Sequence, residues 1–134
     1  MPSSSTHTTR SETRLLHLYI STYRQLYHTD SSAAYHITNH FSSLLELPMS
    51  DIIERATADQ KLWWEWKVYL RKHEKSEALY SVSFLLGDVS RELMARGRKG
   101  EARVWKGLAL EVVEMAGGEA EREEEGRRWR RVGG

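Results

Sequence analysis

The chain has 134 residues, of which 40% are hydrophobic and 29% are charged, and its formal net charge is +1. This length and balance are typical of one globular domain, and they exclude a wholly disordered chain. A net charge this small gives no general reason to expect binding to nucleic acid or to an anionic membrane. The chain contains no cysteine, which excludes disulfides, thiol nucleophiles and cysteine-based zinc sites.

The hydropathy pattern and the amino-terminal residues bear on location. No apolar run approaches the roughly 18 residues of a membrane span. The first residues, MPSSSTHTTRSETR, contain no apolar stretch of the kind that a secretory signal has. We therefore expect an intracellular protein, cytoplasmic or nuclear, and the Ser, Thr and Arg content of this segment leaves a mitochondrial location open. Residues 1–10 are expected to form a flexible tail.

Apolar residues recur every three or four positions along most of the chain, which predicts an all-α fold. Asp30 or Ser31 can cap the second of the expected helices, and Ser76 can cap the fourth. Pro48 and the glycines after Ala116 act as stop signals. The five helices expected from these signals run over about 12–28, 32–45, 51–74, 77–96 and 101–117.

The stretch 52–70, IIERATADQKLWWEWKVYL, contains three of the five tryptophans. On a helical wheel at about 100° per residue its apolar side chains cover far more than one stripe, which is typical of a helix covered on several sides. Thr57 and Gln60 have capping-box spacing, so a break at Ala56 is an alternative, but the unbroken apolar phase favours one helix. The sequence therefore predicts a compact antiparallel bundle of about five helices packed around this Trp-rich central helix, with disordered tails at both ends.

The last segment, EAEREEEGRRWRRVGG, has a block of glutamates followed by arginines on both sides of Trp129. Glu123 and Glu124 stand four residues before Arg127 and Arg128, a spacing that supports helix. A glycine between the two blocks weakens that helix. We interpret 119–134 as a charged tail that is mobile or conditionally helical, and 11–118 as the bundle domain.

No pattern in the sequence predicts catalysis. His36 and His40 are one helical turn apart, with His28 and Asp30 upstream, and imidazoles at this spacing can bind a metal. The plainer interpretation, which we favour, is a half-exposed pair on a helix flank. No motif such as G-x-S-x-G surrounds any serine. The turn 97–100 could hold a phosphate at a helix start, but we favour the interpretation of a solvated turn. We expect no enzyme, no metal and no cofactor.

Aromatic residues and the charged tail are the features that favour a binding function, because Trp, Tyr and Arg dominate binding hot spots. We predict a non-enzymatic interaction, adaptor or complex-subunit protein whose partner is another protein, with a homodimer also compatible. The alternative is a small-molecule or lipid-binding bundle that uses a cavity between the Trp-rich helix and the first helix. An Arg-rich tail also suits nucleic acid, although the adjacent glutamates nearly neutralise it. The candidate partner-binding residues are Trp64, Trp66, Tyr69, Arg127, Arg128, Trp129, Arg130 and Arg131.

The segment 22–26, Thr-Tyr-Arg-Gln-Leu, with Phe41 downstream, resembles the LYR-motif family of mitochondrial assembly factors. Those small helical proteins bind acyl carrier protein and assist iron–sulfur delivery or complex assembly, so the resemblance implies such a partner and role. Thr22 replaces the leucine of the motif, and Tyr27 and His28 stand where leucine and arginine are expected. Because Tyr23 is equally explained as a core aromatic residue, we keep this resemblance as a further alternative and not as an identification.

Overall fold

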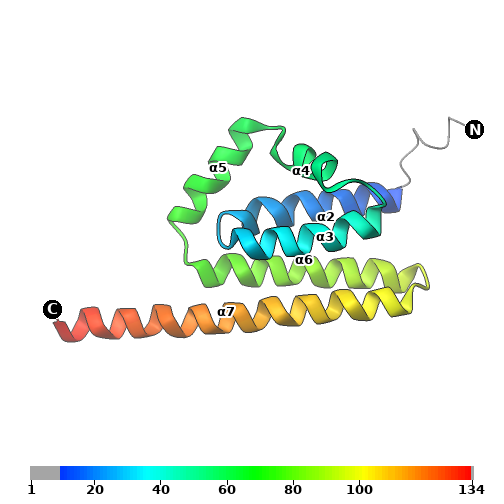
Figure 1. The fold of residues 1–134 in the computed structure, drawn as a ribbon. Coiled ribbons are helices and arrows are strands. Elements are labelled where there is room, and N and C mark those ends of the chain that lie inside the picture. Colours follow the sequence, from blue (N-terminus) through cyan, green and yellow to red (C-terminus); the bar gives the residue numbers. More distant parts are fainter. Residues whose placement is uncertain (1–9, 134) are drawn as a thin grey trace, which may run out of the picture.

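The computed structural model describes residues 10–133, so the expected tail over residues 1–10 lies almost entirely outside the described residues. The described chain is all helical, as predicted, and contains no strand. None of its helices combines the length and the apolar character needed to cross a bilayer. The helices are α2 (Arg10–Tyr27), α3 (Ser31–Leu45), α4 (Met49–Thr57), α5 (Gln60–Arg71), α6 (Lys75–Ala95) and α7 (Lys99–Gly133) (Figure 1).

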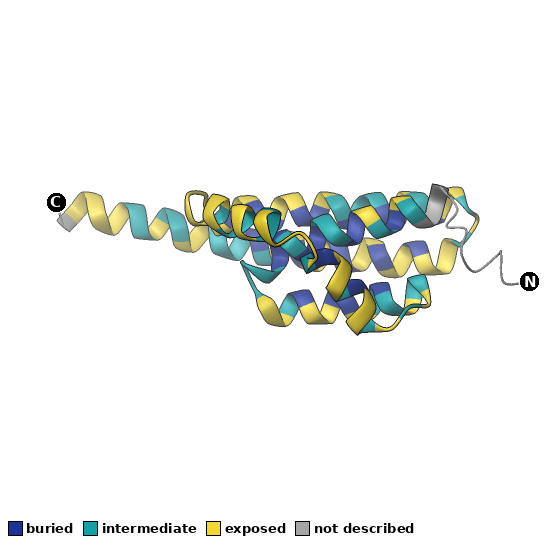
Figure 2. Cartoon of the chain, turned by 90° about the horizontal axis from the view of Figure 1, so that it is seen from above, coloured by how far each residue is buried: buried dark blue, intermediate teal, exposed yellow. Residues whose placement is uncertain are grey.

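Four long helices, α2, α3, α6 and α7, run lengthwise beside one another and enclose the core (Figure 1). The Phe41 ring of α3 joins two of the others, because its centroid lies 5.0 Å from that of Tyr19 in α2 and 4.4 Å from that of Trp105 in α7. The Tyr19 hydroxyl lies 3.3 Å from the Thr38 hydroxyl, which gives the buried polar atoms a partner. Figure 2 shows the buried residues along the inner sides of these helices.

α6 and α7 form a helical hairpin, and the contact between them is the most extensive between any two helices of the fold. The hairpin turns at Gly97, whose φ of 79° is one that glycine adopts without strain. Near the turn the Ser90 hydroxyl donates to the carbonyl of Ala102 at 2.7 Å, which holds the two helices side by side. α7 has 35 residues and α6 has 21, so the carboxyl-terminal part of α7 extends beyond the other helices (Figure 1).

The expected end of the last helix at Gly117 and Gly118 is wrong, since α7 continues to Gly133. Each internal glycine costs about 1 kcal/mol relative to alanine. Tertiary contacts compensate, because Ala116 is fully buried just before the glycines and Glu123 binds the start of α6 just after them. Residues 119–133 are therefore part of the hairpin helix and not a separate disordered tail.

The interpretation of 51–74 as one central helix is also wrong, and the alternative of a break near Ala56 is closer to the structure, since α4 ends at Thr57 and α5 begins at Gln60. The chain breaks between α4 and α5, and polar side chains complete the two ends: Arg24 Nε donates to the Ala56 carbonyl at 2.9 Å, and the Asp59 carboxylate accepts from the Leu62 N–H at 3.0 Å. None of the α5 residues is buried. Figure 1 shows α5 standing apart from the four long helices. Because of this break α5 lies at the periphery of the molecule. Its apolar side chains, which predicted a central position, are therefore partly exposed.

Candidate interaction surface

Trp63 anchors α5 to the rest of the molecule. Its ring centroid lies 5.2 Å from that of Tyr27, 5.8 Å from that of Tyr23 and 4.4 Å from that of His28, all at the end of α2. Burial lowers the pKa of His28 below 6.5; a hydrogen bond with the Trp63 backbone opposes the shift, and the Lys67 charge adds to it. Packing against Trp63 therefore favours the neutral form of this imidazole.

The outward side of α5 presents apolar side chains to solvent. Trp64 is 52% exposed, and the Lys67 ammonium lies over its ring at 4.6 Å from the centroid. Val68 and Tyr69 are also about half exposed. Trp64 and Val68 lie one turn apart, whereas Tyr69 lies on the side of the helix that carries Leu62 and Trp66, so α5 exposes apolar groups on two sides. Exposed apolar surface of this kind marks a candidate interaction site.

A groove of about 420 Å³ runs along α5, lined by Leu62, Glu65, Trp66 and Tyr69. A smaller hollow of about 150 Å³ shares Trp66 and Tyr69 and reaches residues of α2 and α6. The Tyr69 ring is braced on one side by Trp66, at 5.5 Å between centroids, and on the other by His73, at 3.9 Å. Two of the four side chains that line the groove are therefore aromatic rings, on a helix none of whose residues is buried.

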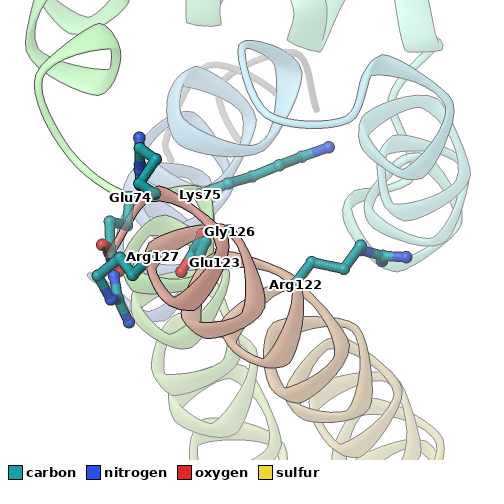
Figure 3. Close-up of a pocket in the computed structure, with 7 residues that line it drawn as sticks. Glu74, Lys75, Arg122, Glu123, Gly126 and Arg127 are labelled. Atoms are coloured by element: carbon teal, nitrogen blue, oxygen red, sulfur yellow. Dashed lines mark hydrogen bonds and ion pairs between the residues drawn. The ribbon is translucent and has the colours of Figure 1, made fainter. Parts of the chain in front are cut away.

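The last turns of α7 contact the start of α6 through Arg127. Arg127 forms ion pairs with Glu74 and with Glu124, the latter at 3.0 Å. Trp129, one residue beyond Arg128, is 69% exposed. A polar pocket of about 630 Å³ lies here, lined by Glu74, Lys75, Arg122, Glu123, Gly126, Arg127 and Arg130. In Figure 3 the Lys75 and Arg122 side chains extend to the same side of the view, whereas Arg127 lies on the other side. Lys75 Nζ and Arg122 Nη2 lie 3.8 and 2.9 Å from the same oxygen of Glu119, so both cations are already paired.

The eight candidate residues fall on two surfaces at the same end of the molecule. Trp64, Trp66 and Tyr69 lie on α5, whereas residues 127–131 lie at the end of α7 (Figure 1). The segment between α5 and α6 connects them, because His73 stacks on Tyr69 while the adjacent Glu74 pairs with Arg127. Sequence reasoning did not identify this link, since its residues are 53 positions apart and no local signal relates them.

The residues of the LYR-like segment and of the histidine pair make contacts within the fold. Tyr23 is buried, and Arg24 holds the end of α4 through the Ala56 carbonyl. The His36 and His40 rings lie 5.0 Å apart, and the described part of the chain contains no group of three residues that could hold a metal ion. The motif positions of the LYR resemblance are thus engaged inside the fold.

The fold and this surface define an all-α protein with an exposed aromatic helix and an extended, charged hairpin helix. The sequence matches no protein-family model, and comparison with curated proteins and with solved structures found no similar protein. Function therefore has to be argued from the surface itself, because a helical fold hosts many functions.

Proposed function

We propose that this chain is a non-enzymatic interaction protein, an adaptor or complex subunit, whose partner binds the outward side and groove of α5. The observation that supports this most directly is that a helix with three tryptophans among its 12 residues buries none of them fully. Isolated from a partner, such a helix leaves apolar surface in water without compensation. Docking of an apolar segment would remove that surface.

The chemistry of the partner follows from the walls of the groove. Leu62, Trp66 and Tyr69 offer apolar contacts, and the rigid rings lose little conformational entropy on binding. Lys61, Lys67 and Arg71 of α5 outnumber its single acidic residue, Glu65. The arginines at the end of α7 are largely paired with Glu124 and Glu74, so the positive charge of this surface comes from α5. The best-fitting partner is therefore an amphipathic helix with apolar anchors and acidic flanks.

A second candidate is the binding of a small apolar ligand or lipid. It is favoured by the groove of about 420 Å³, which falls within the volume range of small-molecule sites, roughly 300–1,000 Å³. The two functions differ in a simple observable. A ligand-binding chain purified from cells should carry bound material, and its tryptophan emission should shift after delipidation; an adaptor should do neither.

A pull-down from cells of the native organism, analysed by mass spectrometry, tests the main proposal. The bait is the full chain, compared with Trp64→Ala, Trp66→Ala and a chain that ends after Arg127. Arg127 is retained because it pairs with Glu74, so this truncation removes the exposed end and leaves the start of α6 intact.

One protein enriched by the full chain and lost with Trp64→Ala or Trp66→Ala would support the proposed α5 surface. Loss only on truncation would move the binding surface to the end of α7. Recovery of acyl carrier protein would instead favour the LYR-like alternative. If only the bait is recovered from every sample, the adaptor proposal fails and a bound small molecule becomes the function to test. The matched control is Val104→Ala, which also shortens an exposed apolar residue but lies near the hairpin turn, outside both candidate surfaces.

A further inference from the structure

The outer face of the α6–α7 hairpin carries a second apolar surface that is separate from α5. Phe84 is 71% exposed and Leu110 is 56% exposed. Tyr80 lies one turn before Phe84 on α6, and Val113 lies one turn after Leu110 on α7; both are about 40% exposed. None of these four side chains belongs to the core, whose buried residues line the opposite sides of the same helices.

The hairpin contacts place these four residues at one level. Ser90 bonds to Ala102 near the turn, and Ser76 bonds to Glu123 at the far end. With that register Phe84 lies level with residues of α7 between about 108 and 115, which include Leu110 and Val113. Trp105 marks the side of α7 that faces α3. On a helical wheel Leu110 lies about 140° from Trp105 and about 80° from Ala102, whose carbonyl contacts Ser90 of α6, which puts Leu110 toward the α6 side. The four side chains therefore form one patch, which we call the hairpin patch.

Charged residues border the hairpin patch, with bases toward the turn and acids toward the other end. On α7 the residues toward the turn are basic, Arg103 and Lys106, and those toward the other end are acidic, Glu114 and Glu121. All four are exposed, and among the described residues none of them forms an ion pair. α6 repeats the order, with Arg91 toward the turn and Glu77 toward the other end. Each of the two also has a partner within its own chain, since Arg91 pairs with Asp88 and Glu77 lies 3.4 Å from His73.

The spacing of these charges is symmetrical about the centre of the patch. Arg91 and Glu77 stand seven residues on either side of Phe84, and Lys106 and Glu114 stand four residues on either side of Leu110. Arg103 and Glu121 stand nine residues on either side of residue 112. The two centres on α7, residues 110 and 112, differ by about 3 Å along the helix, so reversing the direction of the hairpin places each of these bases close to the former position of an acid.

We propose that the hairpin patch binds the same patch of a second copy of this chain, with the two copies antiparallel. The two-fold axis crosses the helices at the level of Phe84 and Leu110, so α6 packs on α6 and α7 on α7. Arg103 and Lys106 of one copy then face Glu121 and Glu114 of the other. A parallel arrangement would place base on base and acid on acid, which disfavours it.

The available area fits a reversible dimer. From Arg103 to Glu121 the face is about 27 Å long, at about 1.5 Å per residue, and two adjacent helices are about 20 Å wide. Each copy would bury about 500 Å², and about 1,000 Å² in total is the lower bound for a specific interface. We therefore expect association that depends on concentration in the micromolar range. It involves neither α5 nor the end of α7, so it is independent of the proposed function.

Sedimentation velocity of the full chain over a hundredfold range of concentration tests the dimer. Wild type should shift from monomer to dimer. Phe84→Glu should raise the dissociation constant at least about tenfold, because it brings two carboxylates together on the axis. Val132→Glu is the matched control: it adds the same charge at an exposed apolar position of α7 outside the patch, and it should leave the dimer intact. Circular dichroism checks that each variant is folded.

A charge exchange tests the antiparallel arrangement itself. Arg103→Glu and Glu121→Arg, each alone, should raise the dissociation constant about threefold or more, and the double variant should return toward the wild-type value. Wild type that stays monomeric at every concentration would overturn the proposal. So would a dimer that Phe84→Glu leaves unchanged, or a double variant weaker than both single ones.

Discussion

Glu123 of α7 binds Ser76 of α6 with both carboxylate oxygens. One oxygen accepts from the Ser76 backbone N–H at 3.0 Å, and the other accepts from the Ser76 hydroxyl at 2.5 Å. The residue at the N-cap position, Glu74, makes no capping hydrogen bond with its own side chain. The start of α6 is therefore capped by a carboxylate 47 residues away, and this contact fastens the extension of α7 to the bundle.

Glu123→Gln should weaken this contact and loosen the end of α7. We expect the free energy of unfolding to fall by about 1 kcal/mol, the usual value of a cap, because the amide lacks the charge that the helix start favours. Denaturant unfolding measures that loss, and hydrogen exchange should reveal faster opening of amides in 119–133. Glu125→Gln is the control, since Glu125 is exposed and forms no ion pair among the described residues. Equal losses in both variants would contradict a capping role.

The same carboxylate should make stability depend on pH. Burial by itself would raise the pKa of Glu123, but the hydrogen bonds from Ser76 and the nearby Arg127 outweigh it, so the pKa lies below 4.5. A pKa lowered in the folded state gives stability that is present above the unfolded value and is lost as the pH falls through the folded one. Unfolding free energy measured from pH 6 to 3 should decline less steeply in Glu123→Gln than in wild type.

His28 predicts a second dependence, nearer neutrality. Its folded pKa is lowered below 6.5, chiefly by burial against Trp63. Stability from the neutral ring is therefore complete above about pH 6.5 and declines as the pH falls below that value. Because the ring packs on Trp63, acidification should loosen α5 before the bundle unfolds. Tryptophan emission should shift to the red as the pH falls below about 6.5, and His28→Gln should remove the part of this shift that arises from Trp63.

Truncation of the adjacent Trp63 and Trp64 should change the free energy of unfolding by very different amounts. Trp63→Ala removes the ring that packs on Tyr27 and His28, so we expect a loss of about 2 kcal/mol, less than for a fully buried tryptophan. Trp64→Ala removes a half-exposed ring and should change stability by less than about 0.5 kcal/mol. Thermal unfolding of the two variants measures the difference. A large loss for Trp64→Ala would place that ring in the folded core and weaken its assignment to a binding surface.

Local signals in the sequence predicted the helical class and several boundaries correctly. The apolar spacing around Tyr19 and Phe41 predicted two helices with buried faces, and both residues are fully buried. Asp30 caps α3 as expected, because its carboxylate accepts from the Ala33 N–H. These features depend on residues within one or two turns of each other, so a single sequence is enough to predict them.

Long-range contacts decided the rest. Apolar coverage of 52–70 indicates only that the helix could be covered on several sides; whether neighbours cover it depends on the break at Asp59 and on where Trp63 packs. In the same way, Gly117 and Gly118 end a helix only when nothing holds the chain beyond them, and here Glu123 and Arg127 do so from the start of α6. Local propensities are worth about 1 kcal/mol per residue, so tertiary contacts of similar size override them. The sequence by itself determined that helices form and which residues can be buried; the tertiary structure decided which apolar faces stay exposed, and hence where a partner can bind.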